Sequence, residues 1–219
     1  VKLRFPWTLY HRPIVDRLER ELARVSGGQV LNVGSGPFLE LDHLVTSSCR
    51  FSVCDIDARA IEFARQHHQA RLEQALVCEK DAPLPFPDHS FDLVVAMDVI
   101  EHLPEPSTWL AELGRVTRPS GRLYLTTPNY GSVSLRLIEN TALELVARFH
   151  GFTRRGIHPT KMDRARLTGV FEAAGLGPPV IEELAFGWVL AATAAKSPAT
   201  AEPGKSSTGG VSKEEPSHG

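Results

Sequence analysis

Phe91–Pro104, with the sequence FDLVVAMDVIEHLP, is the stretch that decides the fold of this chain. Its first half is a run of apolar residues typical of a buried strand, which ends near Ala96. A polar cluster of Asp98, Glu101 and His102 follows at once. In an open parallel sheet, ligands bind just beyond the carboxyl ends of the strands. The stretch therefore predicts a parallel sheet with a reactive site at the end of this strand.

Further apolar runs occur on both sides of this stretch, separated by helical patterns such as that of Ile14–Val25. Strands that alternate with helices at this spacing predict an α/β fold of the Rossmann-like, doubly wound kind, with a mostly parallel sheet. Seven strands are expected, namely Val30–Val33, Phe51–Cys54, Leu76–Cys78, Phe91–Ala96, Arg122–Thr126, Val180–Ala185 and Trp188–Ala194.

The last two expected strands are joined only by Phe186-Gly187. A parallel crossover needs about a dozen residues or more. This short connection therefore predicts that the two strands form an antiparallel C-terminal hairpin on the otherwise parallel sheet.

Composition predicts one domain over residues 1–195 and a disordered tail over residues 196–219. The 219 residues, 42% of them hydrophobic, suffice for one sizeable core. From Lys196 onward the chain has almost no large apolar residue, so it cannot bury enough surface to offset its ordering entropy. An insertion at 129–159 carries a helical apolar pattern over Leu135–Phe149, which indicates either a helix packed on the core or a lid over the site.

Charge and cysteine content limit the compartment and the partners of the chain. The net charge of −2 gives no support for a nucleic-acid partner, because such proteins are normally strongly basic. No apolar run is long enough to span a membrane, and the N-terminus lacks the apolar region of a signal peptide. Cys49, Cys54 and Cys78 lack metal-ligand spacing, so we expect reduced thiols. These features predict a soluble, cytoplasmic protein.

Val30–Phe38, with the sequence VLNVGSGPF, predicts a strand, a glycine loop and the start of a helix. Gly34 and Gly36 would let the backbone turn sharply and approach a ligand. Asp55 ends the next strand, at about the offset where a carboxylate accepts hydrogen bonds from a ribose diol. Leu39 stands where a dinucleotide-binding loop needs its third glycine, so a pyrophosphate is not expected. Together these residues predict a nucleoside site.

Four motifs in chain order give the chain a family resemblance. They are VLNVGSGPF, CDID, KDAPLPFPDHSFDLVVAMDVIEHL and ELGRVTRPSGRLYLTTPN, which together cover about Gln29–Asn129. In this order they resemble the class I S-adenosylmethionine-dependent methyltransferases, including the methyltransferase type 11 group and the ubiquinone-biosynthesis O-methyltransferases. An antiparallel terminal hairpin is also a feature of that family. The resemblance implies S-adenosyl-L-methionine as the cofactor.

The same resemblance implies a set of cofactor contacts. The glycine loop would lie against the methionine part, and the acidic residue after the second strand would hold the ribose hydroxyls. The loop after the third strand would contact adenine. The implied residues are Gly34, Ser35 and Gly36 for methionine, Asp55 for the ribose, Ile56, Asp81 and Ala82 for adenine, and Met97 near the bound cofactor.

Two positions depart from the family pattern. The family usually has Asp or Glu where this chain has Asn32, and glycine where it has Phe38. Asn32 can still accept a hydrogen bond but brings no charge towards the ammonium group of the cofactor. Charge-assisted hydrogen bonds are about twice as strong as neutral ones, so we expect weaker cofactor binding. Phe38 would alter the geometry of the loop.

The polar cluster after the fourth strand has three interpretations. If the segment turns helical, Asp98, Glu101 and His102 lie on one face. Glu101 and His102 could merely hydrogen-bond the loop, or His102, together with Glu101, could act as a general base or orient the acceptor. In the third interpretation the three residues join His158 around a divalent metal ion, which would lower the pKa of an acceptor hydroxyl.

The metal interpretation also rests on a resemblance. The stretch is similar to the acidic-x-x-Glu-His motif of ubiquinone-biosynthesis O-methyltransferases and small-RNA 2′-O-methyltransferases, in which a metal has this role. His158 is included because it follows the insertion, and its other interpretation is a solvent-facing loop histidine.

The leading hypothesis is an S-adenosylmethionine-dependent methyltransferase that acts on a small-molecule acceptor, on oxygen. Asn32 and Phe38 also allow a protein that binds the cofactor without catalysis. An RNA 2′-O-methyltransferase is a third hypothesis, which the charge balance disfavours and which a local group of basic residues keeps open. That group is Arg148, Arg154, Arg155 and Lys161.

Overall fold

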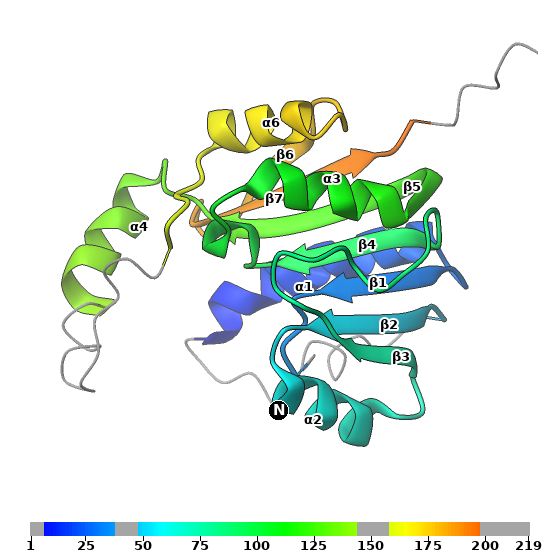
Figure 1. Cartoon of the computed structure of the whole chain (residues 1–219). Helices are drawn as coiled ribbons and strands as arrows, with labels where there is room; N and C mark the ends of the chain where they lie inside the picture. Colours follow the sequence, from blue (N-terminus) through cyan, green and yellow to red (C-terminus); the bar gives the residue numbers. More distant parts are fainter. Residues whose placement is uncertain (1–6, 38–47, 144–157, 198–219) are drawn as a thin grey trace, which may run out of the picture.

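A seven-stranded sheet forms the centre of the structure, a computed structural model that describes residues 7–37, 48–143 and 158–197 (Figure 1). Its strands are β1 (Gln29–Val33), β2 (Arg50–Asp55), β3 (Leu72–Val77), β4 (Phe91–Met97), β5 (Thr117–Pro128), β6 (Val180–Leu184) and β7 (Val189–Ala195). They lie in the order β3-β2-β1-β4-β5-β7-β6. β7 runs antiparallel to both of its neighbours, and the other neighbouring pairs are parallel. The predicted fold class, a doubly wound and mostly parallel sheet with an antiparallel terminal hairpin, is confirmed.

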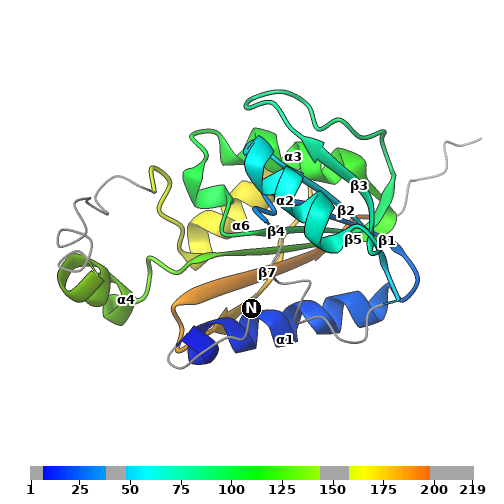
Figure 2. The same cartoon turned by 90° about the horizontal axis from the view of Figure 1, so that it is seen from below.

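Helices cover both faces of this sheet. They are α1 (Trp7–Arg24), α2 (Ala58–His68), α3 (Pro106–Val116), α4 (Val133–Ile138) and α6 (Arg164–Ala173), with a 3-10 turn η2 (Ile100–His102) and a π-helical turn η3 (Glu139–Leu143). Side chains of a strand alternate between faces, so Leu93 and Val95 of β4 share an apolar cluster with α1 and α2. Val94 and Ala96 share the other cluster with α3 and α6. Figure 2 shows α1 on one side of the sheet and α3 and α6 on the other.

β3 and α1 begin earlier than their sequence patterns indicated. β3 starts at Leu72 instead of Leu76, because it is an edge strand whose first residues are largely exposed and carry no apolar run. α1 starts at Trp7 and includes Pro13, although its apolar spacing becomes clear only at Ile14. Tyr10 packs beside Ile14 against the end of the β6–β7 hairpin. Packing against residues that are distant in sequence therefore extends this helix towards its N-terminus.

The segment Pro119-Ser120-Gly121 forms an irregularity inside β5. The register between β4 and β5 shifts here, and Ser120 adopts a φ of +64°. The Ser120 amide donates to the carbonyl of Lys196 at 3.1 Å, and the Lys196 amide donates to Gly121 at 2.8 Å. Ordered pairing thus extends to Lys196, which the prediction assigned to the tail. Residues 198–219 lie outside the described residues.

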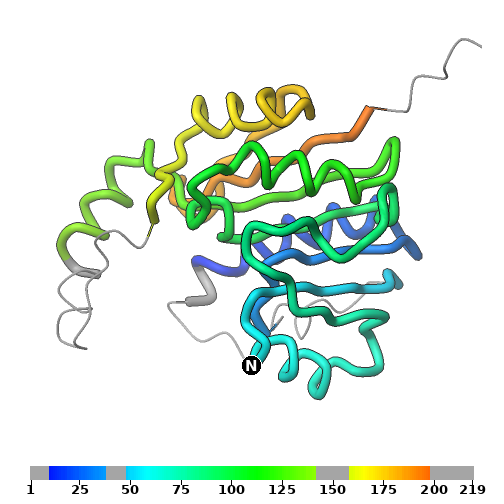
Figure 3. The backbone as a smooth tube through the Cα atoms, viewed as in Figure 1, coloured from blue at the N-terminus to red at the C-terminus, as the bar shows by residue number. Residues whose placement is uncertain are grey.

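The predicted insertion begins with a helix, as its apolar pattern indicated. α4 and η3 stand away from the sheet, beyond the end where β5 finishes (Figure 3). Leu135 of α4 is buried, whereas Val133 and Leu137 are 70% and 64% exposed. The rest of the pattern, at 144–157, lies outside the described residues. None of the helices that the structure describes has the length and apolar character to cross a membrane.

Candidate active site

The glycine loop after β1 presents bare backbone at the carboxyl edge of the sheet. Gly34 and Gly36 have φ values of +68° and +51°, which favour glycine. The Gly34 amide donates to the carbonyl of Cys54 at 2.8 Å, which ties the loop to β2. A Cβ atom on Gly34 would lie 2.4 Å from Cγ2 of Val99, so no larger residue fits. Ser35, between the two glycines, is buried.

Asp55 joins this loop to the start of α2. One carboxylate oxygen accepts the Gly36 amide at 2.7 Å, and the other accepts the Asp57 amide at 2.8 Å. Each oxygen keeps a second lone pair, so the carboxylate can also accept the two hydroxyls of a ribose. Asp57 caps α2 by accepting the Arg59 amide at 2.9 Å. The geometry fits the nucleoside-holding role predicted for Asp55.

Asn32 is a buried polar residue whose side chain has no protein partner among the residues that the structure describes. It is 2% exposed, and neither its amide nitrogen nor its amide oxygen makes a hydrogen bond there. A buried polar group without a partner is costly. Asn32 lies in β1, two residues before Gly34, so a ligand group over the glycine loop could satisfy it.

Asn32→Asp is expected to tighten binding of S-adenosylmethionine by about fivefold to tenfold, because a carboxylate would form a charge-assisted hydrogen bond with the ammonium group. Calorimetric titration measures the effect. 5′-Methylthioadenosine is the matched ligand, since it lacks the amino-acid part and should bind both proteins equally. Equal or weaker affinity of the variant for S-adenosylmethionine would contradict the assignment of Asn32.

The residues implied to hold adenine lie on two segments that flank the edge of the sheet. Ile56, directly after Asp55, is 65% exposed, an unusual state for a large aliphatic side chain and one that a flat ring could cover. Asp81 is exposed and has a φ of +62°, and Ala82 is half-buried. Met97 ends β4 and packs between the core and the β6–β7 hairpin.

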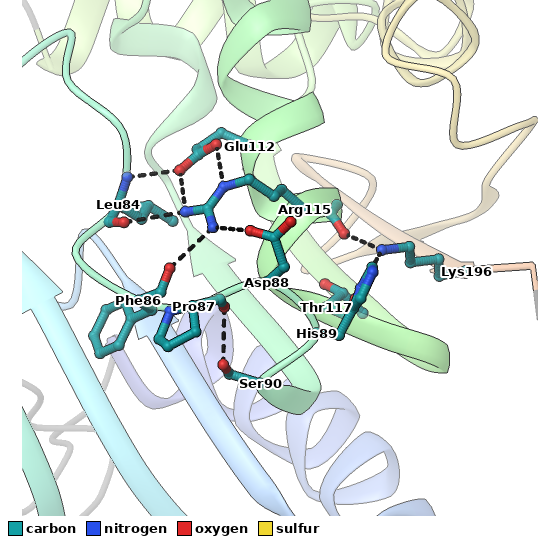
Figure 4. Close-up of polar contacts among 11 residues, drawn as sticks. Leu84, Phe86, Pro87, Asp88, His89, Ser90, Glu112, Arg115, Thr117 and Lys196 are labelled. Carbon is teal, nitrogen blue, oxygen red and sulfur yellow. Dashed lines mark hydrogen bonds and ion pairs between the residues drawn. The ribbon is translucent and has the colours of Figure 1, made fainter. Parts of the chain in front are cut away.

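A polar network on α3 holds the loop that carries Asp81 and Ala82 (Figure 4). The Leu84 amide donates to Glu112 at 2.7 Å, and Arg115 donates to the Leu84 carbonyl at 3.1 Å. The same two side chains form a short ion pair with each other at 2.6 Å. This network restricts the loop just beyond the proposed adenine contacts.

The polar cluster after β4 does not form one helical face. Asp98 adopts a φ of +54°, which is incompatible with a right-handed helix, and only Ile100–His102 form a short 3-10 turn. The helical arrangement of Asp98, Glu101 and His102 is therefore wrong. Asp98 accepts the Thr126 hydroxyl at 3.2 Å, whereas Glu101 is buried and accepts the Thr127 hydroxyl at 3.0 Å.

Glu101 and His102 meet His158 across a large distance in sequence. Each of the three offers one ligand atom, and these atoms lie within 4.8 Å of one another. The rings of His102 and His158 stand edge to face, with centroids 4.8 Å apart. Within the described ranges, the structure thus brings together three of the four predicted metal-ligating residues, and Asp98 is not part of that group.

Hydrogen bonds hold the His158 segment against η2. The Thr160 amide donates to the Glu101 carbonyl at 3.1 Å, and its hydroxyl donates to Leu103 at 2.6 Å. The hydroxyl of Tyr130 is hydrogen-bonded to Nδ1 of His158. His158 is therefore fixed from two sides, which does not fit the interpretation as a solvent-facing loop histidine.

The two carboxyl groups of this site resist ionisation. Burial, reinforced by the negative charge of Asp98, raises the pKa of Glu101 to about 7. The Asp98 side chain reaches solvent, but the protein atoms around it desolvate the carboxyl and raise its pKa above the ordinary value. The Thr126 hydrogen bond and the nearby His11 and His102 oppose that rise.

Sequence reasoning missed Thr126, Thr127 and Tyr130. The first two end β5 next to β4, and the rule that ligands meet strand ends could have identified them. Tyr130 follows shortly after, and no local pattern identifies it. His11 was also missed, because only the packing of α1 brings it near Asp98.

Comparisons with known proteins find similarity to methyltransferases. Residues 31–125 match a family model described as a methyltransferase domain. A Mycobacterium tuberculosis protein named "Probable S-adenosylmethionine-dependent methyltransferase" is 32% identical over 56% of this chain and 43% of its own length. A ubiquinone biosynthesis O-methyltransferase of Thiobacillus denitrificans is 28% identical over 52% of this chain and 50% of its own length. The chain spans about half the length of these relatives.

Solved structures share the fold. A SAM dependent methyltransferase from Aquifex aeolicus matches with a TM-score of 0.64 at 20% identity, over 89% of this chain and 95% of the other. Magnesium protoporphyrin IX methyltransferase from Synechocystis, solved with bound SAH, matches with a TM-score of 0.65 at 16% identity, over 90% of each chain. Sheet order, the matched domain and the named relatives together make this chain similar to the S-adenosylmethionine-dependent methyltransferases.

Proposed function

We propose that this chain is an enzyme that transfers the methyl group of S-adenosylmethionine to an oxygen atom of a small-molecule acceptor. One observation carries the proposal. The loop at Gly34–Gly36, clasped by Asp55, and the cluster of Glu101, His102 and His158 lie beyond the carboxyl ends of neighbouring strands. A donor site beside a group of proton acceptors is what methyl transfer to a hydroxyl requires.

The donor is proposed to lie across the ends of β1, β2 and β4. Asn32 and Gly34–Gly36 would meet its methionine part, and Asp55 would hold its ribose. The adenine would pack on Ile56 and contact the Asp81–Ala82 segment, with Met97 close to the cofactor. Among the described residues the amide of Asn32 has no partner and Ile56 is exposed, and a bound donor would cover both, which supports this orientation.

Acceptor chemistry is assigned to Glu101 and His102. Methyl transfer from a sulfonium is an in-line displacement, so the acceptor oxygen must face the methyl group and lose its proton as the bond forms. Glu101 lies on the protein side of the cluster and His102 is exposed, so His102 is the group that an acceptor reaches. Tyr130 and His158 lie near the two ends of the insertion and are hydrogen-bonded to each other beside Glu101 and His102, which supports a role for the insertion near the acceptor.

The three-residue cluster also fits a divalent cation. One carboxylate and two imidazoles suit zinc or manganese better than magnesium, which prefers oxygen ligands. A cation bound there by Glu101, His102 and His158 would lower the pKa of an acceptor hydroxyl. Asp98 lies near the cluster and would add negative charge without direct ligation.

The function is tested by incubating the full chain with S-adenosylmethionine and a panel of phenols, catechols, carboxylates, amines and a short RNA. Mass spectrometry identifies the methylated product. Transfer to a hydroxyl of a small molecule, lost in Glu101→Gln and retained in Glu105→Gln, is the expected result. Glu105 is exposed and close in sequence, so it controls for the loss of one charge. Methylation of RNA, or cofactor binding with no transfer to any acceptor, would contradict the proposal.

Zinc or manganese is expected to raise the melting temperature of chelator-treated protein, and His158→Ala is expected to remove most of that rise. His67→Ala is the matched control, since His67 is exposed on α2 away from the cluster. Thermal unfolding with and without each ion measures the effect independently of activity. An equal rise in the wild type and in His158→Ala would rule out ligation by His158.

Glu101→Gln is expected to make the metal-free protein more stable above pH 7. The pKa of Glu101 rises from 4.5 to about 7 on folding. Between these values the folded protein holds a proton that the unfolded chain has released, so stability falls as pH rises. The loss in the free energy of unfolding is complete above the pKa of the folded protein and amounts to about 3 kcal/mol at most. Glutamine removes this loss and can still accept the Thr127 hydrogen bond.

Thermal unfolding in chelator, from about pH 5 to about pH 8.5, measures this dependence. Glu105→Gln should follow the wild-type curve. A Glu101→Gln curve with the same slope as the wild type would show that Glu101 does not titrate as assigned.

A further inference from the structure

Cys54 and Cys78 lie at the ends of two neighbouring strands, beside the proposed adenosine site. Cys54 belongs to β2 and is fully buried, and Cys78 directly follows β3 and is half-buried. The Cys78 amide donates to the carbonyl of Asp55 at 2.9 Å, which ties the two strand ends together. Both side chains belong to the same apolar cluster.

The two thiols interact directly, and the interaction makes them unequal. A side-chain hydrogen bond between them raises the pKa of Cys54 and lowers the pKa of Cys78. Of the two thiols, Cys78 is the one whose lowered pKa favours the thiolate. The thiolate is the form that reacts with oxidants. Cys78 is also the more exposed of the two, so an oxidant reaches it first.

Cys49 is isolated from this pair. Its thiol donates to the carbonyls of Leu22 and Val25, at 3.7 and 3.5 Å. Its side chain belongs to the apolar cluster on the opposite face of the sheet, with α1. Cys49 therefore serves as an internal control for any chemistry of the pair.

The backbone of the pair supports the methyl-donor site. The carbonyl of Cys54 accepts the amides of Gly34 and Ser35, at 2.8 and 3.3 Å. Asp55, which clasps the glycine loop, follows Cys54 directly. Cys78 leads into the loop that carries Asp81. A change in the distance between the two cysteines would therefore displace groups on both sides of the proposed nucleoside site.

We propose that Cys54 and Cys78 are a redox-sensitive pair whose disulfide weakens binding of the methyl donor. The inference rests on the proposed function for the effect on binding. The oxidant is a hydroperoxide, here hydrogen peroxide. The Cys78 thiolate attacks one peroxide oxygen, the O–O bond breaks, and a sulfenic acid and hydroxide result. The Cys54 sulfur then attacks the Cys78 sulfur, and the S–O bond breaks as the S–S bond forms. In sum, two thiols and one peroxide become one disulfide and two waters.

The disulfide requires the two strand ends to approach. Sulfur atoms in a disulfide are about 2 Å apart, closer than two sulfur atoms that are not bonded, and the Cβ atoms are about 3.8 Å apart. The approach moves the Cys54 carbonyl away from its position under the Gly34 amide. The site for the methyl donor is thereby distorted without any loss of its own side chains.

The test uses the full chain, oxidised with hydrogen peroxide, with the remaining thiols then alkylated. Peptide mapping by mass spectrometry is expected to find a Cys54–Cys78 link and a free Cys49. In calorimetric titration, S-adenosylhomocysteine is expected to bind the oxidised protein about tenfold more weakly, and dithiothreitol should restore the affinity. Before and after peroxide treatment, Cys78→Ser should bind S-adenosylhomocysteine with the affinity of the chemically reduced wild-type protein. Cys49→Ser should respond as the wild type does.

Two outcomes would overturn the inference. One is the absence of the Cys54–Cys78 link after oxidation, and the other is linked protein that binds S-adenosylhomocysteine as well as reduced protein does. Reduced protein that binds no S-adenosylhomocysteine would contradict the proposed function, and with it the effect on binding. In that case peptide mapping by mass spectrometry would still show whether the Cys54–Cys78 disulfide forms.

Discussion

Gly34→Ala is expected to weaken binding of S-adenosylhomocysteine by at least about 100-fold. Gly34 has a φ of +68°, and its new Cβ would lie 2.4 Å from Cγ2 of Val99. The left-handed backbone costs an L residue about 1–2 kcal/mol. The close contact adds about 1–3 kcal/mol of overpacking. The loop relieves this strain by moving away from Val99, which also moves the amides that the donor would contact.

Gly27→Ala is the matched control for this prediction. Gly27 has a φ of +76°, and nothing lies within 4 Å of the position that its new Cβ would take. It therefore carries the backbone strain of Gly34→Ala without the clash, and it lies before β1, outside the site. Calorimetric titration and thermal unfolding separate affinity from stability. Wild-type affinity in Gly34→Ala would show that the loop does not hold the donor.

Asp55→Asn is expected to weaken donor binding by about 100-fold, because the uncharged amide loses charge-assisted hydrogen bonds to the ribose. The substitution also removes a contact within the protein. The two carboxylate oxygens accept the Gly36 and Asp57 amides, and an asparagine can accept only one of these donors. Its NH₂ group would face the other amide, and this repulsion loosens the clasp on the glycine loop.

Asp57→Asn controls for the lost charge. Asp57 lies two residues away and caps α2, a role that asparagine fills equally well. Its affinity for S-adenosylhomocysteine should stay within about twofold of the wild type. A small effect of Asp55→Asn, equal to that of Asp57→Asn, would remove Asp55 from the proposed ribose contact.

Much of the fold could be predicted because its signals are local. Each buried strand is a short apolar run, and the brief Phe186-Gly187 connection admits only a hairpin. The errors occur where a partner decides the outcome. The start of β3 is hidden because an edge strand needs no apolar run, and the irregularity of β5 around Ser120 depends on its register with β4 and on Lys196.

The donor half of the candidate site was also predictable from the sequence. Asn32, the glycine loop and Asp55 each occupy a strand or the few residues after it. Once the strands are known to be parallel, their carboxyl ends meet at one edge, and these residues come together without further information. Local position along the chain was enough. Their roles toward the donor remain predictions that the substitutions above test.

The acceptor half depended on the tertiary structure. By itself, the sequence determined that Asp98, Glu101 and His102 follow the end of a buried strand, because such a strand is identified by a run of neighbouring apolar residues. Only the tertiary structure decided that Asp98 adopts a left-handed conformation outside the three-residue cluster, while Tyr130 and Thr160 hold His158 and its segment against Glu101 and His102. The physical reason is that contacts between residues distant in sequence arise from packing and hydrogen bonding across elements. No periodic pattern in the local sequence indicates such contacts.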